Sequence, residues 1–395
     1  MPVSPEMPAT PCVSGSWNQR LLARQAARRD AGLWRERRVH RRDATLDFAG
    51  NDYLGLARDP RLAEAAAIGA RHHGAGARAS QLVSGHLEIH RHLEARLAAL
   101  VGRPRALLFT SGYLANLGVL QALCDGTTAI FQDRLNHASL LDGARLAGAP
   151  SRRFHHGDLD DLACLLERTD PATPRLVVSD GVFSMDGDIA DVAGLVGLCR
   201  RHDAWLMVDD AHGLGVLGAH GDGCVGRAHA SDEVPVLMGT LGKALGSAGA
   251  FVAGSELLIE HLLQFARPCI YTTAEPPGVS AATLAALDIL EQEPERRARL
   301  HAHIARFRTG AEALGLRLLP STTPIQPLLL GDNARTLHWA EALRARGLLV
   351  GAIRPPTVPR GQARLRITLS AAHETSQIDR LLDALAELAT KENRS

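Results

Sequence analysis

One lysine, Lys243, stands in the glycine-rich segment 239–246, directly after the apolar run 234–238. Lysine is almost never fully buried unless its charge is paired, so an amine at the end of an apolar strand is a poor packing element. It suits an enzyme that joins that amine to an aldehyde cofactor as a Schiff base. A solvated loop lysine is the alternative interpretation of so short a motif, and the surrounding residues decide between the two.

Polar residues follow five predicted strands in succession, and Lys243 follows the last of them. In an open α/β sheet, ligands bind beyond the carboxyl ends of the strands, so these residues predict one site at one edge of a sheet. The five strands are expected at 106–109, 128–131, 175–178, 204–208 and 236–238. The polar residues after them are Gly112 and Tyr113, then His137, then Ser184, then Asp209 and His212, and finally Thr240 and Lys243.

A pyridine-aldehyde phosphate would use residues of these types. The N–H groups of Gly112 and Tyr113 would open a helix and form an anion site for the phosphate. Asp209 would keep the ring nitrogen protonated by charge pairing, which lets the ring accept electrons. The other polar residues would cover the ring or bond its oxygen and the phosphate (His137, His212, Ser184, Thr240). Taken singly, Asp209 could be a helix cap, Ser184 a turn residue and His137 a core histidine.

The elements that position these residues alternate between strand and helix from about residue 105 to 255, with a further strand at 249–252. Continuous apolar strands between helices predict a mostly parallel sheet covered on both faces. A helix-rich stretch follows at 278–315. Strands at 325–330 and 364–369 around a helix at 334–346, with a closing helix at 375–391, then predict a small α/β domain. We expect a flexible tail at 1–15, a helical and basic segment at 16–50, a large domain at 51–285 and a small domain at 286–395.

Composition excludes several classes of protein. The chain has 395 residues, of which 46% are hydrophobic and 22% charged, with a net charge of +1. This balance is ordinary for a soluble globular protein, and a net charge so close to zero argues against a protein whose overall charge attracts nucleic acid or membranes. The apolar runs are too short for a membrane span, and residues 1–15 do not read as a signal peptide. Six cysteines without CxxC spacing predict reduced thiols and a cytoplasmic location, and the sequence predicts no metal site.

Two motifs suggest other functions, namely nucleic-acid binding and dinucleotide binding. The arginine-rich stretch within residues 16–42 could contact nucleic acid, but interspersed acidic residues favour a solvated helix face. Segment 213–218, GLGVLG, fits the glycine pattern of dinucleotide-binding folds. That pattern requires a helix to start within the glycines, and the AHGDGC that follows is too rich in glycine for one. The nicotinamide interpretation is therefore disfavoured.

In this order, the segments SGYLAN, DRLNHASLLDG, DGVFSMDGD, VDDAHGLGVLG and GTLGKALG resemble the α-oxoamine synthases from about residue 17 to the end. The resemblance implies a pyridoxal-phosphate enzyme of fold type I, aspartate aminotransferase-like, with a mostly parallel seven-stranded sheet in the large domain and a small C-terminal α/β domain. It also implies a homodimer with the site at the subunit interface. Segments 48–57, 262–273 and 352–373 look most like the members that join L-alanine to a pimeloyl thioester in biotin biosynthesis.

The resemblance assigns roles to individual residues. Lys243 would be the Schiff-base lysine and the general base, and Asp209 the partner of the pyridine nitrogen. His212 would contact the ring oxygen, and His137 would stack on the ring. Gly112, Tyr113, Ser184 and Thr240 would complete the cofactor shell. Arg354 would hold the amino-acid carboxylate, with Thr357 and Arg35 as further substrate contacts. The loop at 74–86 departs from the family pattern at Arg78 and Ala79.

The implied reaction is a decarboxylating condensation. L-alanine and a pimeloyl thioester, on CoA or on an acyl carrier protein, would give 8-amino-7-oxononanoate, CO2 and the free thiol. One alternative is a sister synthase such as glycine C-acetyltransferase, which would take glycine and a shorter acyl-CoA. Another is a non-catalytic subunit on the same fold, and the presence of Lys243, Asp209 and His137 argues against it.

Overall fold

The computed structural model describes residues 16–40 and 45–392 and divides the chain into two compact units, Met1–Thr45 and Leu46–Ser395. In the first unit, helix α1 spans Ser16–Asp30, and none of its side chains is buried. Arg35 follows it in exposed chain without helix or strand. The predicted tail at 1–15 and the basic residues Arg41 and Arg42 lie outside the described residues.

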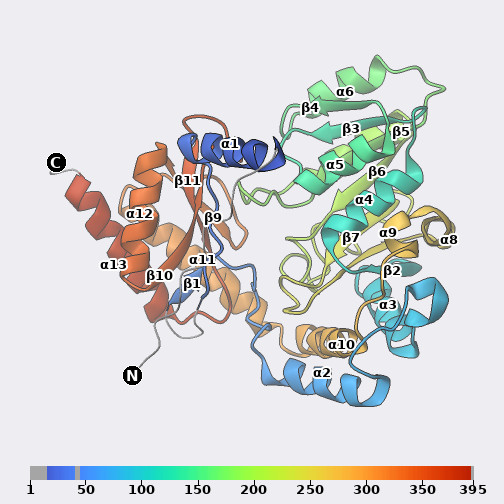
Figure 1. The fold of residues 1–395 in the computed structure, drawn as a ribbon, viewed down its shortest axis with the longest axis horizontal. Helices are drawn as coiled ribbons and strands as arrows, with labels where there is room; N and C mark the ends of the chain where they lie inside the picture. The colour runs from blue at the N-terminus through green and yellow to red at the C-terminus, as the bar shows by residue number, and fades with distance from the viewer. Residues whose placement is uncertain (1–15, 41–44, 393–395) are drawn as a thin grey trace. The chain divides into compact units, whose positions relative to one another are not determined.

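The second unit contains a seven-stranded sheet with the order β2-β8-β7-β6-β5-β3-β4 (Figure 1). Neighbouring strands from β7 through β6, β5 and β3 to β4 are parallel, whereas β8 is antiparallel to both β7 and β2. The strands are β2 (Arg105–Phe109), β3 (Ala129–Asp133), β4 (Ser151–Phe154), β5 (Arg175–Asp180), β6 (Ala204–Asp209), β7 (Val236–Thr240) and β8 (Ala250–Gly254). The mostly parallel sheet confirms the predicted fold class.

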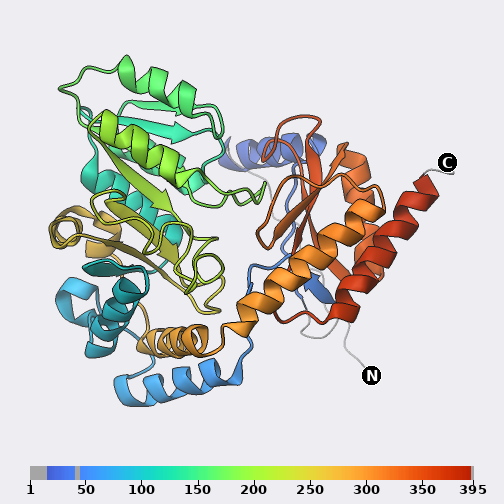
Figure 2. The same cartoon turned by 180° about the vertical axis from the view of Figure 1, so that it is seen from behind.

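Helices cover both faces of this sheet because its central strands are apolar on both sides. Alternate residues of β2 belong to different cores: Leu107 and Phe109 face one, Ala106 and Leu108 the other. Helices α4 and α5 lie on one face in Figure 1, and α7 covers the opposite face in Figure 2. The helices of this region are α2 (Pro60–His73), η1 (Gln81–Gly85), α3 (Glu88–Leu100), α4 (Gly112–Leu123), α5 (Ala138–Ala147), α6 (Leu159–Glu167), α7 (Val192–Arg201), α8 (Glu256–Phe265), α9 (Arg267–Ile270) and α10 (Pro277–Gln292).

A second, four-stranded sheet has the order β1-β10-β11-β9. Its strands are β1 (Leu46–Phe48), β9 (Ile325–Gly331), β10 (Leu348–Ile353) and β11 (Ala363–Thr368). Helices α11 (Glu295–Ala313), α12 (Asn333–Ala345) and α13 (Thr375–Glu392) contribute buried side chains such as Phe307, Trp339 and Leu381 to its core. Strand β1 pairs in parallel with β10, so residues 46–48 join a sheet built otherwise from residues beyond 324. The domain boundaries at residues 50 and 285 stay predictions.

Three strands have no counterpart in the sequence-based expectations: β1, β4 and β10. Strand β4 reads Ser-Arg-Arg-Phe and buries only Phe154, because it pairs with β3 alone at the edge of the sheet. Such a strand shows no apolar run. Strand β1 has only three residues, and β10 is buried at only two of six positions. Among the described residues, the structure has no helix that is both long and apolar enough to cross a membrane.

Candidate functional site

All eight residues predicted to hold the cofactor line one cavity of about 180 Å³. It lies beyond the carboxyl ends of the strands, because β2, β3, β5, β6 and β7 all point the same way and only β8 among their neighbours is reversed. The predicted residues in its wall are Gly112, Tyr113, His137, Ser184, Asp209, His212, Thr240 and Lys243. Five further residues, which the sequence did not single out, complete the wall: Asn116, Ser139, Asp180, Ala211 and Met238.

Lys243 lies in the turn between β7 and β8, which is closed by the Gly246 N–H donating to the Lys243 carbonyl at 2.9 Å. Gly246 has φ +62°, and a Cβ there would lie 2.3 Å from the Ala57 backbone nitrogen, so only glycine fits. Burial is the main cause that lowers the pKa of the Lys243 ammonium to about 8, and the charges of Asp209 and Asp180 oppose it. No hydrogen bond or ion pair within residues 16–40 and 45–392 uses its amine.

Asp209 is the last residue of β6 and is 5% exposed. One carboxylate oxygen accepts the Ala211 N–H at 3.0 Å, and the other accepts the side-chain amide of Asn116 at 2.7 Å. Asn116 also donates to the Ser139 hydroxyl at 2.8 Å, which lies 2.7 Å from His137 Nδ1. Asn116, a polar residue buried in the otherwise apolar helix α4, therefore joins the two predicted residues Asp209 and His137. Its polarity within that helix was the sequence signal for it.

A second buried carboxylate, Asp180, stands beside Asp209. The two residues are direct neighbours in the register of β5 and β6. Asp180 accepts the His137 N–H at 3.0 Å and so fixes the start of α5. Burial, and then the negative charge of Asp209, raise the pKa of Asp180 well above its usual value. Two like charges this close cannot both be ionised without cost, and here the cost appears in the raised pKa of Asp180.

The ring of His212 is fixed by Tyr53, whose hydroxyl lies 2.6 Å from His212 Nδ1. Tyr53 is fully buried and also donates to the side chain of Asn51 at 3.2 Å. Burial, followed by the nearby positive charges of Lys243 and Arg366, lowers the pKa of His212 well below its ordinary value. The imidazole is therefore neutral at physiological pH.

Arg366 brings a buried positive charge to this region and was missed from the sequence. Its side chain is held by the Ser184 carbonyl at 2.6 Å, the Thr368 hydroxyl at 3.0 Å and the Asn51 side chain at 3.1 Å. Arg364, two residues earlier, is paired with Asp186 at 2.6 Å, but no ion pair of the described residues includes Arg366. A buried guanidinium without a carboxylate is able to receive an anionic group.

The start of α4 offers the anion site that the sequence predicts. Ser111 caps the helix by accepting the Leu114 N–H at 3.3 Å. The N–H groups of Gly112 and Tyr113 have no hydrogen-bond partner among the described residues, and both residues line the cavity. The Tyr113 hydroxyl donates to Asp142 at 2.6 Å, and the Thr240 hydroxyl donates to the Gly249 carbonyl at 3.0 Å.

Three predicted substrate residues are not in the cavity wall. Arg354 follows β10 and is partly buried, and Thr357, whose N–H donates to the Arg354 carbonyl at 3.0 Å, is exposed. Arg35 belongs to the first unit. The GLGVLG segment at 213–218 forms turns with no helix among its residues, so it lacks the helix that a dinucleotide site needs.

These groups fit pyridoxal phosphate. The N–H pair that opens α4 has no partner within the described part of the chain and suits a phosphate. The Asp209 carboxylate suits a protonated ring nitrogen, and the Lys243 amine suits an aldehyde. At Gly112, a Cβ would meet the protein no closer than 3.5 Å, at the Met238 methyl group. Packing within the protein therefore does not require glycine there, whereas a ligand that approaches the backbone would.

The comparisons with known proteins agree with this geometry. The sequence model of the family "Aminotransferase class I and II" matches residues 44–385. An 8-amino-7-oxononanoate synthase of Chromohalobacter salexigens is 68% identical over 95% of this chain and 98% of its own. The solved structure of an 8-amino-7-oxononanoate synthase from Francisella tularensis is 31% identical, with a TM-score of 0.77, and covers 89% of this chain and 100% of its own. A serine palmitoyltransferase solved with pyridoxal phosphate is 28% identical, with a TM-score of 0.88, over 95% of this chain and 98% of its own.

Proposed function

The chain belongs to the class I and II aminotransferase family and, within it, to the 8-amino-7-oxononanoate synthases, and from this premise we propose which of its residues perform the reaction. The activity is the pyridoxal-phosphate-dependent condensation of L-alanine with a pimeloyl thioester, in biotin biosynthesis. The observation that carries the proposal is one cavity in which a half-buried lysine, a buried aspartate and a helix start meet, the two N–H groups of that helix start having no partner among the described residues.

When bound, pyridoxal phosphate supplies an electron sink for the charge that develops on the amino-acid Cα. Lys243 would hold its aldehyde carbon, and Asp209 would hold the proton on its ring nitrogen. The N–H groups of Gly112 and Tyr113 would bind its phosphate, with the Thr240 hydroxyl once that hydroxyl turns from the Gly249 carbonyl. Ser184 and His212 would bind its ring oxygen, and the Tyr53 hydroxyl, 2.6 Å from Nδ1, holds the His212 ring in place. His137 would lie against the ring.

Lys243 would also move the proton of the reaction. Its amine must be neutral to remove the proton from the alanine Cα, and burial lowers its pKa to about 8, close to the operating pH. The negative charge of Asp209 favours the ammonium and so limits how far the Lys243 pKa falls. The same amine, once protonated, can return the proton after CO2 has left. The cavity therefore tunes one group to act as both base and acid.

The carboxylate of alanine would be held by arginine. Arg366 is buried, lacks an ion pair within the described part of the chain, and touches Ser184 and Asn51 beside the cavity. Arg354 and Thr357, on the segment after β10, would complete this contact when the substrate is bound. Arg35 would meet the pimeloyl group or its carrier. The carrier is either CoA or an acyl carrier protein.

The protein would work as a homodimer. Leu82 and Val83 in η1 are 52% and 78% exposed, and Tyr271 is 70% exposed. A bridge between Ser80 and Thr273 brings these two segments together, so their apolar side chains form one surface. Burying such a surface against a second copy removes apolar area from water. We place the enzyme in the cytoplasm, and the free thiols Cys124, Cys164, Cys199, Cys224 and Cys269 support this location.

A product assay tests the function. Purified protein with pyridoxal phosphate is given L-alanine or glycine, each with pimeloyl-CoA, a pimeloyl-acyl carrier protein or acetyl-CoA, and the amino-ketone is identified by its mass. We expect 8-amino-7-oxononanoate from alanine and at least one pimeloyl thioester, and none with a Lys243→Ala variant. A preference for glycine and acetyl-CoA would assign the sister activity instead. Absence of any amino-ketone would refute the proposal.

A further inference from the structure

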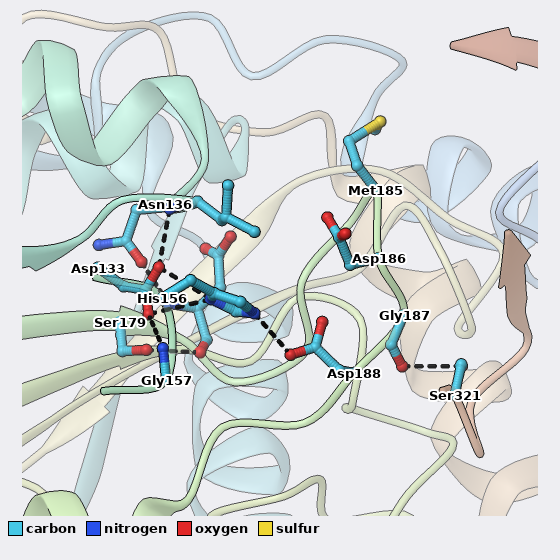
Figure 3. A network of polar contacts seen from close by, with 12 residues as sticks. Asp133, Asn136, His156, Gly157, Ser179, Met185, Asp186, Gly187, Asp188 and Ser321 are labelled. Atoms are coloured by element: carbon cyan, nitrogen blue, oxygen red, sulfur yellow. Dashed lines mark hydrogen bonds and ion pairs between the residues drawn. The ribbon is translucent and has the colours of Figure 1, made fainter. Parts of the chain in front are cut away.

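A charged network lies outside the cavity and has no part in the chemistry so far described (Figure 3). Its centre is His156, just after β4. Nδ1 lies 3.1 Å from each carboxylate oxygen of Asp133, and Nε2 lies 2.8 Å from Asp188. An ionised carboxylate can only accept hydrogen bonds, so both ring nitrogens must donate. The geometry therefore requires a protonated imidazolium, held on two sides.

One of the two carboxylates is rigidly anchored. Asp133 ends β3, and its side chain is 2% exposed. It also accepts the Leu135 N–H at 2.7 Å and the Gly157 N–H at 2.9 Å. The His156 and Phe183 rings pack edge to face, with 4.4 Å between the ring centroids and 83° between the planes. His156 is thereby fixed to the seven-stranded sheet.

The other carboxylate belongs to the loop between β5 and α7, which carries Ser184 into the cavity wall. Asp188 also closes this loop through its backbone, because its carbonyl accepts the Phe183 N–H at 3.0 Å. Figure 3 shows Asp186, Gly187 and Asp188 on one bend, with the His156 ring directed at Asp188. His156 is thus a tie between the sheet and the loop that holds Ser184.

The four-stranded sheet and the segment just before β9 also bind this loop. Arg364 pairs with Asp186 at 2.6 Å, and the Ser321 and Thr323 hydroxyls each donate to the Gly187 carbonyl at 2.9 Å. Gly187 has φ +75°, and a Cβ there would lie 2.4 Å from the Ile325 carbonyl oxygen, so the contact is close. Arg366 donates to the Ser184 carbonyl at 2.6 Å. The position of the loop therefore determines where both Ser184 and Arg366 lie.

We infer that His156 is a positioning residue for the reaction: its two ion pairs hold the loop 183–188 where Ser184 meets the cofactor and Arg366 meets the amino-acid carboxylate. The inference deepens the proposed function and rests on it. Without the tie, the Arg364, Ser321 and Thr323 contacts would still hold the loop, but to the four-stranded sheet alone. Ser184 would then no longer be held at a fixed distance from the cavity residues on the seven-stranded sheet.

The charges around His156 support its protonation. Asp133 and Asp188 together raise its pKa to about 10, although burial acts in the opposite direction. On the neighbouring turn, His155 is paired with Asp161 at 2.6 Å, and Arg134 lies close enough for its charge to act on Asp161. The negative charge of Asp133 also reaches Asp180 in the cavity wall. Asp133 and Asp188 are therefore the groups that hold the proton on His156, and the tie persists through the neutral pH range.

A His156→Gln variant tests the tie, because glutamine is uncharged and has donors on one nitrogen only, its other polar atom being a carbonyl oxygen that cannot donate to the second carboxylate. Its matched control is His155→Gln, since His155 is also a histidine beside an aspartate, but within the described residues its ring bonds Asp161 of α6 instead of the loop. We expect His156→Gln to raise the dissociation constant of pyridoxal phosphate and the KM for L-alanine at least fivefold each. The KM for the pimeloyl thioester should change less than twofold. The control should stay within twofold of wild type in all three.

Far-ultraviolet circular dichroism and dimer mass would first show that each variant is folded. Because cofactor affinity is measured without turnover, its change is separable from a failure of the proposed function, in which wild type itself would make no product. Unchanged cofactor affinity and alanine KM in a folded His156→Gln protein would overturn the inference. So would an equal loss in all substrate constants, which indicates general damage to the fold.

A second variant covers the case in which His156→Gln does not fold. Asp188→Asn removes one carboxylate at a position that is 33% exposed, and it should raise the same two constants. In the double variant His156→Gln/Asp188→Asn, the two amides can bond each other. The combined loss should therefore be smaller than the product of the single losses, as for residues in direct contact. Independent, multiplicative losses would contradict the tie.

Discussion

The chain contains only two lysines, Lys243 in the cavity wall and Lys391 near the end of α13, where it is exposed. This makes the ionisation of Lys243 directly measurable by competitive acetylation of the cofactor-free protein. Only a neutral amine reacts, so the rate of labelling follows the neutral fraction. Lys391 serves as the internal reference in the same sample, because each lysine falls in its own peptide.

The structure fixes the size of the expected effect. Burial lowers the Lys243 pKa from 10.5 to about 8, which favours the neutral amine by about 3 kcal/mol. With a pKa of about 8, the neutral fraction is about 9% at pH 7 and about 91% at pH 9, so labelling should rise about tenfold and then level. An ordinary lysine, with a pKa of about 10.4, would instead rise about hundredfold over that range without levelling.

Two variants test the direction in which neighbouring charges shift the pKa of Lys243. Asp209→Asn removes a negative charge that stabilises the ammonium, so the labelling midpoint should fall below that of wild type. Arg366→Met removes a positive charge that opposes the ammonium, so the midpoint should rise. A hundredfold climb for wild-type Lys243, or midpoints that move in the opposite directions, would refute the reasoning that burial and these charges set its pKa.

Three further substitutions have definite expected outcomes. Asn116→Leu removes the donor to Asp209 and Ser139, so the dissociation constant of pyridoxal phosphate, measured by equilibrium dialysis, should rise about tenfold or more; an unchanged constant would count against this bridge. Gly246→Ala should lower the free energy of unfolding in urea by at least about 1–3 kcal/mol because of its positive φ and the contact with Ala57. Gly242→Ala, whose Cβ would approach no atom closer than 3.5 Å, is its control, and equal effects would contradict the steric argument. Arg366→Met should raise the KM for L-alanine at least tenfold, and a KM that did not move would remove Arg366 from the carboxylate site.

The sequence predicts most of the large sheet because its strands are continuous apolar runs that end in polar residues. Strands β2, β3, β5, β6, β7 and β8 all fall on predicted runs, within a few residues at their ends. Edge and short strands were missed, since β4 carries arginines at two of its four positions and β1 has only three residues. In these elements the pairing partner, not the local sequence, determines the structure.

Cavity residues were predictable where they follow a strand and unpredictable where distant elements bring them in. Asp209 and Lys243 stand directly after apolar runs, and the cavity contains both. Arg366 lies inside β11, among residues that read as a buried strand, and its position beside Ser184 depends on the packing of the two sheets. Tyr53 reaches His212 across 159 residues of sequence. No local pattern records such contacts, so these residues required the fold.

The most direct measurement of the account is to find where the cofactor is attached. Protein loaded with pyridoxal phosphate is reduced with borohydride, digested, and its two lysine-containing peptides are weighed. The account predicts the mass of the reduced cofactor on the peptide with Lys243 and none on the peptide with Lys391, together with loss of activity in proportion to labelling. Cofactor mass on Lys391 alone, or no retained cofactor in protein that still makes product, would contradict it.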